Sequence, residues 1–151
     1  MLSSTVLIVD DDPKMRELLT SILENAAYIV ETASNGKDAI KACKKFPVDV
    51  ALIDVELPDV KGTALLSALK DLRPKMIKII ITGYPSIENA VTAVNEKADG
   101  YIVKPFDPAE LLEMIRKLIA DKKTEYITML REMEKANQST PKIRYQNPDG
   151  W

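Results

Sequence analysis

Four charged residues of this sequence come directly after short apolar runs. They are Asp10 and Asp11 after residues 5–9, Asp54 after residues 48–53, and Lys104 after residues 100–103. Each run is rich in β-branched or other apolar residues, which is typical of buried parallel strands. In an open α/β sheet, ligands bind outside the carboxyl ends of the strands. We therefore expect three carboxylates and one ammonium group to meet at a single edge, as a site for a cation and a phosphoryl group.

Three clustered carboxylates need a compensating positive charge. Two carboxylates about 4 Å apart repel each other by about 4 kcal/mol at an effective dielectric constant of about 20. The cluster therefore either binds protons or recruits a cation, and oxygen ligands favour Mg²⁺ over softer metals. A lysine opposite the metal supplies a point charge for a phosphoryl group in transfer. Each residue alone would be ordinary at a strand end, but together they indicate a magnesium and phosphoryl site.

Four longer segments carry a resemblance to a known family. They are Leu7–Pro13, Leu52–Pro58 with Gly62, Ile79–Gly83 and Tyr101–Phe106. In residues and in order they resemble the receiver domains of two-component response regulators, over about residues 6–120. The resemblance implies a flavodoxin-like (βα)5 fold of the α/β class, with a doubly wound parallel sheet of strand order 2-1-3-4-5. It also implies a signalling receiver, not an enzyme, that promotes its own phosphorylation and dephosphorylation.

The resemblance also assigns roles to the acidic residues. Asp54 would accept a phosphoryl group from a sensor histidine kinase or a phosphotransfer protein. Asp11 would bind Mg²⁺ directly and Asp10 mainly through water, with Asp54 and the backbone carbonyl of Glu56 as further ligands. The Glu56 side chain would flank the site, where the family tunes the lifetime of the aspartyl phosphate. We expect Asp12 to cap a helix rather than to bind the metal.

Residues of the fourth and fifth strands would complete the site. The Thr82 hydroxyl would donate to a phosphoryl oxygen, and Lys104, followed by a cis proline bond, would contact the phosphoryl group. Gly83 would leave room for the phosphodonor, and Tyr84 would flank the site. Tyr101 occupies the family's aromatic switch position, with an inward and an outward ring position. Without the resemblance, Thr82 and Tyr101 would be read as ordinary strand residues that satisfy a backbone carbonyl or pack on a helix.

The patterns along the chain predict how these residues are positioned. Strand and helix alternate, which predicts a parallel sheet covered by helices on both faces. The expected strands are residues 5–9, 28–32, 48–53, 76–82 and 100–103. The fourth helix would begin after Ser86 and has an apolar set of Ile87, Ala90, Val91 and Val94. Helical spacing then continues past the usual end of a receiver, so we expect a receiver domain over 1–120, a helical extension over 121–136 and an irregular tail over 137–151.

The composition excludes several classes of function. With 21 basic and 23 acidic residues, the chain lacks the basic excess of a nucleic-acid binder. No apolar stretch reaches the roughly 18 residues needed to span a bilayer, and the N-terminus has no signal-peptide pattern. The single Cys43 suits a reducing compartment. We therefore expect a cytoplasmic protein without a nucleic-acid or membrane partner. The absence of histidine excludes a phosphohistidine donor, so this chain would receive the phosphoryl group.

Two other classes share part of this pattern. A haloacid-dehalogenase-like phosphatase also has a strand-end aspartate nucleophile, but it needs a second acid, usually Asp, two residues later. This chain has Glu56 there and lacks a cap insertion. A flavodoxin-like nucleotide binder would need a phosphate-binding glycine loop after the first strand, and none follows it. The phosphatase is kept as the alternative to the receiver.

The helical extension predicts a further interaction. From Leu111 to Met133 the apolar spacing is roughly heptad, with an interruption at Lys122. An isolated extension of about 15 residues is marginal in water. It would therefore fold back on the domain, pair with a second copy, or lead into another domain. We favour self-pairing in a coiled-coil-like seam, which gives a homodimer.

Overall fold

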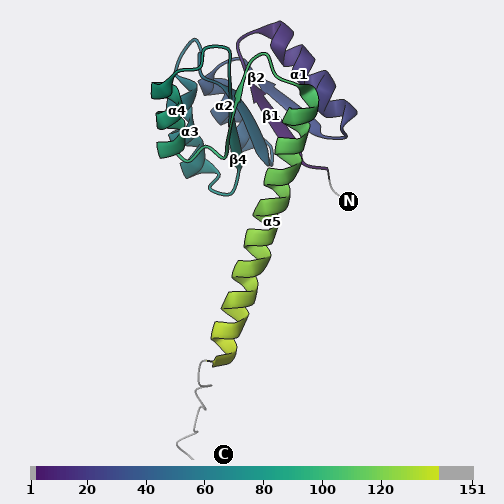
Figure 1. The fold of residues 1–151 in the computed structure, drawn as a ribbon, viewed down its shortest axis with the longest axis vertical. Helices are drawn as coiled ribbons and strands as arrows, with labels where there is room; N and C mark the ends of the chain where they lie inside the picture. The colour runs from purple at the N-terminus through teal and green to yellow at the C-terminus, as the bar shows by residue number, and fades with distance from the viewer. Residues whose placement is uncertain (1–2, 140–151) are drawn as a thin grey trace, which may run out of the picture. The chain divides into compact units, whose positions relative to one another are not determined.

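The computed structural model describes residues 3–139, which form a five-stranded parallel sheet and five helices (Figure 1). The sheet has the order β2-β1-β3-β4-β5, so the predicted fold is confirmed. In chain order the elements are β1 (Thr5–Val9), α1 (Pro13–Asn25), β2 (Ile29–Ala33), α2 (Gly36–Lys45), β3 (Val50–Asp54), α3 (Gly62–Leu72), β4 (Ile77–Thr82), α4 (Ile87–Asn95), β5 (Gly100–Val103) and α5 (Pro108–Ser139).

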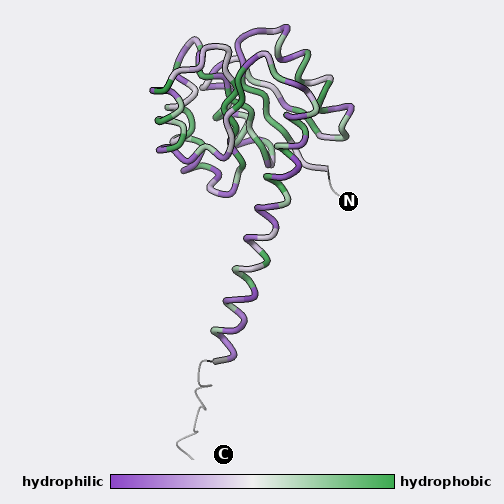
Figure 2. Tube along the Cα trace, in the orientation of Figure 1, coloured by the Kyte–Doolittle hydropathy of each residue, from purple (hydrophilic) through white to green (hydrophobic). Residues whose placement is uncertain are grey.

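The central strands form the core because helices cover both faces of the sheet. Every residue of β1 and β4 is buried, and Figure 2 shows apolar residues concentrated in the strands. Alternate residues such as Val9, Ile53 and Ile80 pack with α2, α3 and α4 in one cluster. The opposite face is covered by α1 and the first turns of α5, where Leu111 and Ile115 are fully buried (Figure 1). The strand ends are thereby held at fixed positions.

Side-chain caps define where four of the described helices begin. Asp12 accepts a hydrogen bond from the Lys14 N–H at 3.0 Å, with a proline in the first turn of α1, so its predicted capping role is confirmed. Asn35, Ser86 and Asp107 cap α2, α4 and α5 in the same way. Because these caps satisfy N–H groups that lack partners inside the helix, they fix the turns that lead out of the strands.

The apolar set expected for α4 lies on the surface rather than in the core. Ile87, Val91 and Val94 are 86%, 52% and 74% exposed, and the buried residue of this helix is Ala93. The three exposed residues follow helical spacing, so they form one apolar face, which we call the α4 face. Periodicity alone predicted the stripe but not the side of the helix that contacts the sheet.

The chain divides into two units, Met1–Leu118 and Ile119–Trp151, and the described part of the second unit is helical. α5 ends at Ser139, so residues 137–139 are helical and the irregular tail does not begin at 137 as expected. Asn137 and Gln138 lower helix propensity only slightly, so the helix continues through them. The rest of the expected tail lies outside the described residues, and the domain boundary at 120 stays a prediction. None of the described helices is long and apolar enough to cross a membrane.

Candidate functional site

The register of the sheet brings the three acidic residues together. Val9, the last residue of β1, pairs with Ile53, so Asp10 comes next to Asp54 at the carboxyl edge. Asp10 and Asp11 follow the end of the strand, and the Asp12 N–H donates to Asp10 Oδ1 at 2.9 Å, which turns the chain. Carboxylate oxygens of Asp10, Asp11 and Asp54 lie within 4.8 Å of one another. The two neighbouring acids can converge because the chain has already left the strand.

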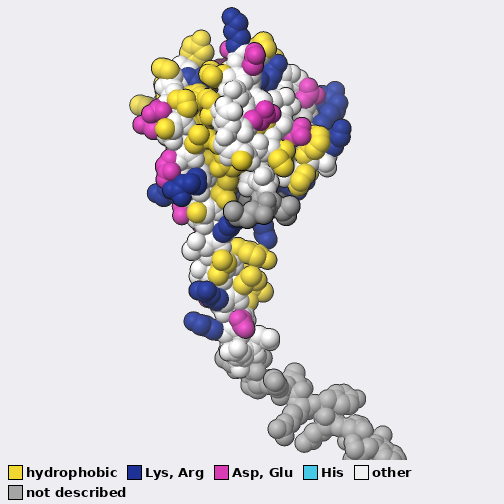
Figure 3. Space-filling view, turned by 90° about the vertical axis from the view of Figure 1, so that its right-hand side faces the viewer, with side chains coloured by type: hydrophobic (Ala, Val, Ile, Leu, Met, Phe, Trp, Pro, Cys, Tyr) yellow, Lys and Arg dark blue, Asp and Glu magenta, His cyan; other side chains and the backbone are white. Residues whose placement is uncertain are grey.

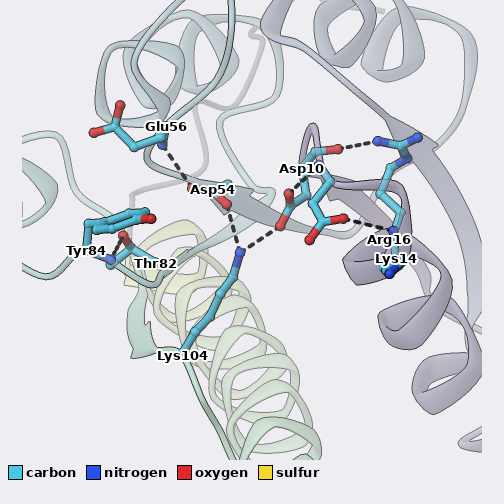
Figure 4. A network of polar contacts seen from close by, with 9 residues as sticks. Asp10, Lys14, Arg16, Asp54, Glu56, Thr82, Tyr84 and Lys104 are labelled. Carbon is cyan, nitrogen blue, oxygen red and sulfur yellow. Dashed lines mark hydrogen bonds and ion pairs between the residues drawn. The ribbon is translucent and has the colours of Figure 1, made fainter.

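Lys104 reaches this cluster from the carboxyl end of β5, the edge strand on the other side of β4. Its Nζ atom lies 2.8 Å from Asp10 Oδ2 and 2.8 Å from Asp54 Oδ2, as Figure 4 shows. The position of the lysine follows from β5: Val103 pairs with Thr82, and the Lys104 N–H donates to the Thr82 carbonyl at 2.7 Å. The peptide bond between Lys104 and Pro105 is cis, as the resemblance implies. One ammonium group therefore bridges two carboxylates.

Burial and ion pairing compete in setting the protonation of these groups. Burial raises the pKa of Asp10 by more than the hydrogen bond from Lys104 lowers it. Burial would lower the pKa of Lys104, but its hydrogen bonds to Asp10 and Asp54 outweigh this effect, so the pKa is raised and the lysine stays charged at neutral pH. When ionised, the three carboxylates and the ammonium group carry a formal charge of −2. This excess of negative charge fits a divalent cation with oxygen ligands.

The cluster forms one wall of a cleft of about 480 Å³. The lining residues are Asp10, Asp11, Asp12, Met15, Asp54, Glu56, Gly83, Tyr84 and Lys104. Thr82 is not among them: it is fully buried, and its hydroxyl accepts a hydrogen bond from the Tyr84 N–H at 3.0 Å (Figure 4). The Glu56 N–H donates to Asp54 Oδ1 at 2.9 Å, while the Glu56 side chain is exposed. The cleft thus contains most of the predicted site, with the threonine hydroxyl behind it.

Tyr101 occupies an inward position. Its ring packs against the buried cluster that contains Ile80, the residue with which it pairs on β4. Its hydroxyl is buried, and no hydrogen-bond partner for it lies among residues 3–139. A buried donor without a partner costs about 1–3 kcal/mol. The inward ring therefore gains packing but loses hydration of the hydroxyl.

Two contacts that support the site were missed or only partly predicted from sequence. Arg16 Nη1 on α1 donates to the Asp10 carbonyl at 2.7 Å and holds the chain where it leaves β1; no motif signals this residue. The sequence identifies Gly62 only as part of the family motif. A Cβ atom at Gly62 would lie 2.0 Å from the Asp54 backbone oxygen, so a glycine is required there.

A doubly wound parallel sheet with an acidic cluster and a lysine at its carboxyl edge defines the class of receiver modules. Residues 6–116 match the family model of the response regulator receiver domain, and the chain belongs to this family. It is a receiver domain of two-component response regulators, and the phosphatase alternative is not favoured.

Known proteins with sequence and structural similarity have the same domain. The transcriptional regulatory protein CusR of Escherichia coli is 35% identical over 114 residues, which cover 76% of this chain and 50% of CusR. The chain spans about half the length of the curated relatives it matches. A receiver domain protein from Methanospirillum hungatei is 40% identical with a TM-score of 0.80, and the match covers 82% of this chain and 99% of that one. The response regulator TrrA of Thermotoga maritima, solved in complex with Mg²⁺ and BeF, is 31% identical with a TM-score of 0.70, over 76% of this chain and 98% of that one.

Proposed function

We propose that Asp54 accepts a phosphoryl group from a phosphohistidine of a sensor kinase or phosphotransfer protein, in a Mg²⁺-dependent reaction in the cytoplasm. The observation that carries this proposal is the position of the Lys104 ammonium group, 2.8 Å from both Asp54 and Asp10. It places a fixed positive charge beside a carboxylate that lines an open cleft. Charge neutralisation of this kind is the main requirement of phosphoryl transfer.

The residues of this chain would each perform one part of the transfer. An Asp54 carboxylate oxygen forms a bond to phosphorus while the bond from phosphorus to the donor imidazole nitrogen breaks, and the electron pair stays on that nitrogen. Lys104 would then exchange its contact with the Asp54 carboxylate for one with a phosphoryl oxygen. The Glu56 N–H holds the acceptor carboxylate in one orientation at 2.9 Å. Because these groups are preorganised, the domain would promote both its phosphorylation and its dephosphorylation.

The acidic cluster fits the expected cofactor. Asp10, Asp11, Asp54 and the Glu56 backbone carbonyl would hold Mg²⁺, since hard oxygen ligands and an excess charge of −2 suit this ion. When bound, Mg²⁺ would neutralise charge on the oxygens of the phosphoryl group. The crystallised TrrA complex with Mg²⁺ and BeF, from a protein 31% identical to this one, supports the assignment.

Phosphorylation would switch a surface around residues 90–104. Thr82 would turn its hydroxyl from the Tyr84 N–H toward a phosphoryl oxygen, and the space that it leaves is coupled to the ring position of Tyr101. The α4 face overlaps the start of this segment and exposes Ile87 and Val94 at 86% and 74%. Apolar surface of this kind marks an interaction site. We therefore propose that a downstream protein binds there.

Phosphorylation by a small donor tests the proposed function directly. Incubation with acetyl phosphate and Mg²⁺ should add one phosphoryl group per chain, because the cleft supplies the acceptor and, together with Mg²⁺, the neutralising charges. Intact-mass spectrometry would detect the adduct, and hydroxylamine or base should remove it, as expected of an acyl phosphate. Omission of Mg²⁺ should prevent the reaction. A phosphate that resists hydroxylamine and maps to serine or threonine would contradict the proposal.

The second unit would bind a second copy of the chain. Along α5, five residues follow alternating three- and four-residue spacing: Ile119, Lys122, Tyr126, Met129 and Met133. Together with the apolar residues Ile127 and Leu130 beside them, they form what we call the α5 stripe, whose members Tyr126, Met129 and Met133 mark the seam. The last three are 47%, 45% and 61% exposed, and Figure 3 shows apolar side chains along one side of this part of the helix. Heptad spacing of this kind favours a coiled coil, although Lys122 weakens the seam. We propose a homodimer held by this stripe.

The self-association can be tested with two similar substitutions. Met129 lies in the α5 stripe, whereas Thr128 is exposed on the opposite side of the helix. M129E should place a charge in the seam and give a monomer in sedimentation experiments, while T128E, which adds the same charge outside the seam, should remain a dimer. Removal of residues 121–151 should also give a monomer and leave phosphorylation intact. A wild-type protein that sediments as a monomer at high micromolar concentration would rule out this homodimer.

A further inference from the structure

The loop between β3 and α3 is held closed at its base, directly beside the acceptor. The Gly62 N–H donates to the Val55 carbonyl at 2.8 Å, and the backbones of Glu56 and Lys61 pair in an isolated antiparallel β-bridge. Within this base, the Glu56 N–H donates to Asp54 Oδ1. The same peptide segment provides the carbonyl that we assign to the metal. The orientation of the Glu56 backbone therefore depends on how the rest of the loop is fixed.

The tip of the loop is attached to a different element, the start of α2. Asp59 Oδ1 accepts from the Gly36 N–H at 2.8 Å, and Asp59 Oδ2 accepts from the Lys37 N–H at 3.0 Å. Hydrogen bonds from these two N–H groups lower the pKa of Asp59, so the carboxylate is ionised at neutral pH. The N-cap residue Asn35 satisfies only the next N–H group, that of Asp38. Asp59 thus completes the capping of α2 from a loop 22 residues further along the chain.

Close packing accompanies these hydrogen bonds. A Cβ atom at Gly36 would lie 2.3 Å from Val60 Cγ1, so the loop sits directly on the first turn of α2. The two oxygens of Asp59 and the two N–H groups form a bidentate contact, which fixes direction as well as distance. A loop that is closed at its base and held at its tip cannot change the angle of the Glu56 peptide without breaking one of these contacts.

We infer that Asp59 is a positioning residue for the phosphorylation site, which it serves by fixing the loop that carries Glu56. This inference rests on the proposed function, because it concerns the metal affinity of the same site. Loss of the contact would let the Glu56 backbone sample other orientations. Mg²⁺ binding would then weaken, while Asp54 and Lys104 would still react once Mg²⁺ is in excess. Residues that orient metal ligands through a second contact typically change metal affinity by about 10-fold or more.

A matched pair of substitutions separates this role from simple helix capping. D59A and N35A each remove one side-chain cap from the start of α2, but only Asp59 belongs to the loop beside the acceptor. Both variants should lower the unfolding temperature by about 2–8 °C. D59A should weaken Mg²⁺ binding about 10-fold, whereas N35A should leave it unchanged. D59N keeps one acceptor oxygen and should give an intermediate affinity.

The metal-free protein provides a second readout. In amide NMR spectra without Mg²⁺, D59A should shift the Glu56 N–H resonance and speed its hydrogen exchange, and N35A should not. The inference would be overturned if D59A bound Mg²⁺ as tightly as the wild type and its Glu56 resonance were unchanged. The proposed function would then still stand, because the wild-type protein binds Mg²⁺. Failure of the wild-type protein to bind Mg²⁺ would instead overturn the proposed function, and this inference with it.

Discussion

Replacement of Asp54 by asparagine should lower the rate of labelling by acetyl phosphate about 1000-fold or more. In a timed incubation, the hydroxylamine-sensitive phosphate of the wild type should therefore be absent. The amide is a poor nucleophile, although it can still accept the hydrogen bond from the Glu56 N–H. The fold should be retained, because Asp54 lies at a strand end and lines the open cleft. Intact-mass spectrometry after a timed incubation measures the effect.

A second aspartate provides the control for this substitution. Asp71 is exposed on α3 and is not among the residues that line the cleft. D71N makes the same chemical change at a position remote from the acceptor and should be labelled at the wild-type rate. If D54N still acquired a labile phosphate, another carboxylate would be the acceptor and the assignment of Asp54 would be wrong.

Mg²⁺ binding should depend on Asp11 and not on Asp12. D11N removes one of three carboxylates that lie within 4.8 Å of one another and should weaken Mg²⁺ binding by about 10-fold or more. D12N is the matched control: asparagine caps a helix as well as aspartate does, so binding should be unchanged. Titration with millimolar Mg²⁺, followed by amide NMR shifts of residues around the cleft, measures both. A D11N variant that binds like the wild type would place the metal elsewhere.

The same titration should depend on pH in a direction set by Asp10. Burial raises the pKa of Asp10 above its ordinary value, and a protonated carboxyl group does not bind Mg²⁺. The affinity should therefore be highest above this raised pKa and should fall as the pH decreases through it. The fall should begin at a higher pH than for an aspartate with an ordinary pKa. A constant affinity down to pH 4 would show that Asp10 takes no part in binding.

The sequence predicted those features that follow from strand ends. Asp10, Asp54 and Lys104 each lie at the end of a strand. Because the strands are parallel, their carboxyl ends lie at the same edge of the sheet, and these residues meet there. The sequence could not predict which side of α4 faces the sheet, because that helix has an apolar stripe and also a small buried residue, Ala93. Its apolar stripe lies in solvent, where a partner rather than the core would cover it.

Supporting contacts between distant segments were not predictable either. The hydrogen bond from Arg16 to the Asp10 carbonyl and the contact of Asp59 with α2 depend on how loops meet in three dimensions. No short sequence pattern around either residue predicts its contact, since exposed arginines and aspartates are common in loops and helices. Likewise, the family resemblance implies a role for the Thr82 hydroxyl toward a phosphoryl oxygen, but only the structure shows that this hydroxyl accepts a hydrogen bond from the Tyr84 N–H.

The buried hydroxyl of Tyr101 has a consequence for how the basal activity of this receiver can evolve. Phenylalanine would keep the packing of the ring but would not bury an unpaired donor. If the hydroxyl costs about 1–3 kcal/mol, its removal would change the ratio of inward to outward rings about 5- to 150-fold. Tyrosine and phenylalanine codons differ by one nucleotide. Under the proposed switch, selection could therefore reset the unstimulated signalling level through a single oxygen atom, without altering the proposed acceptor or metal ligands.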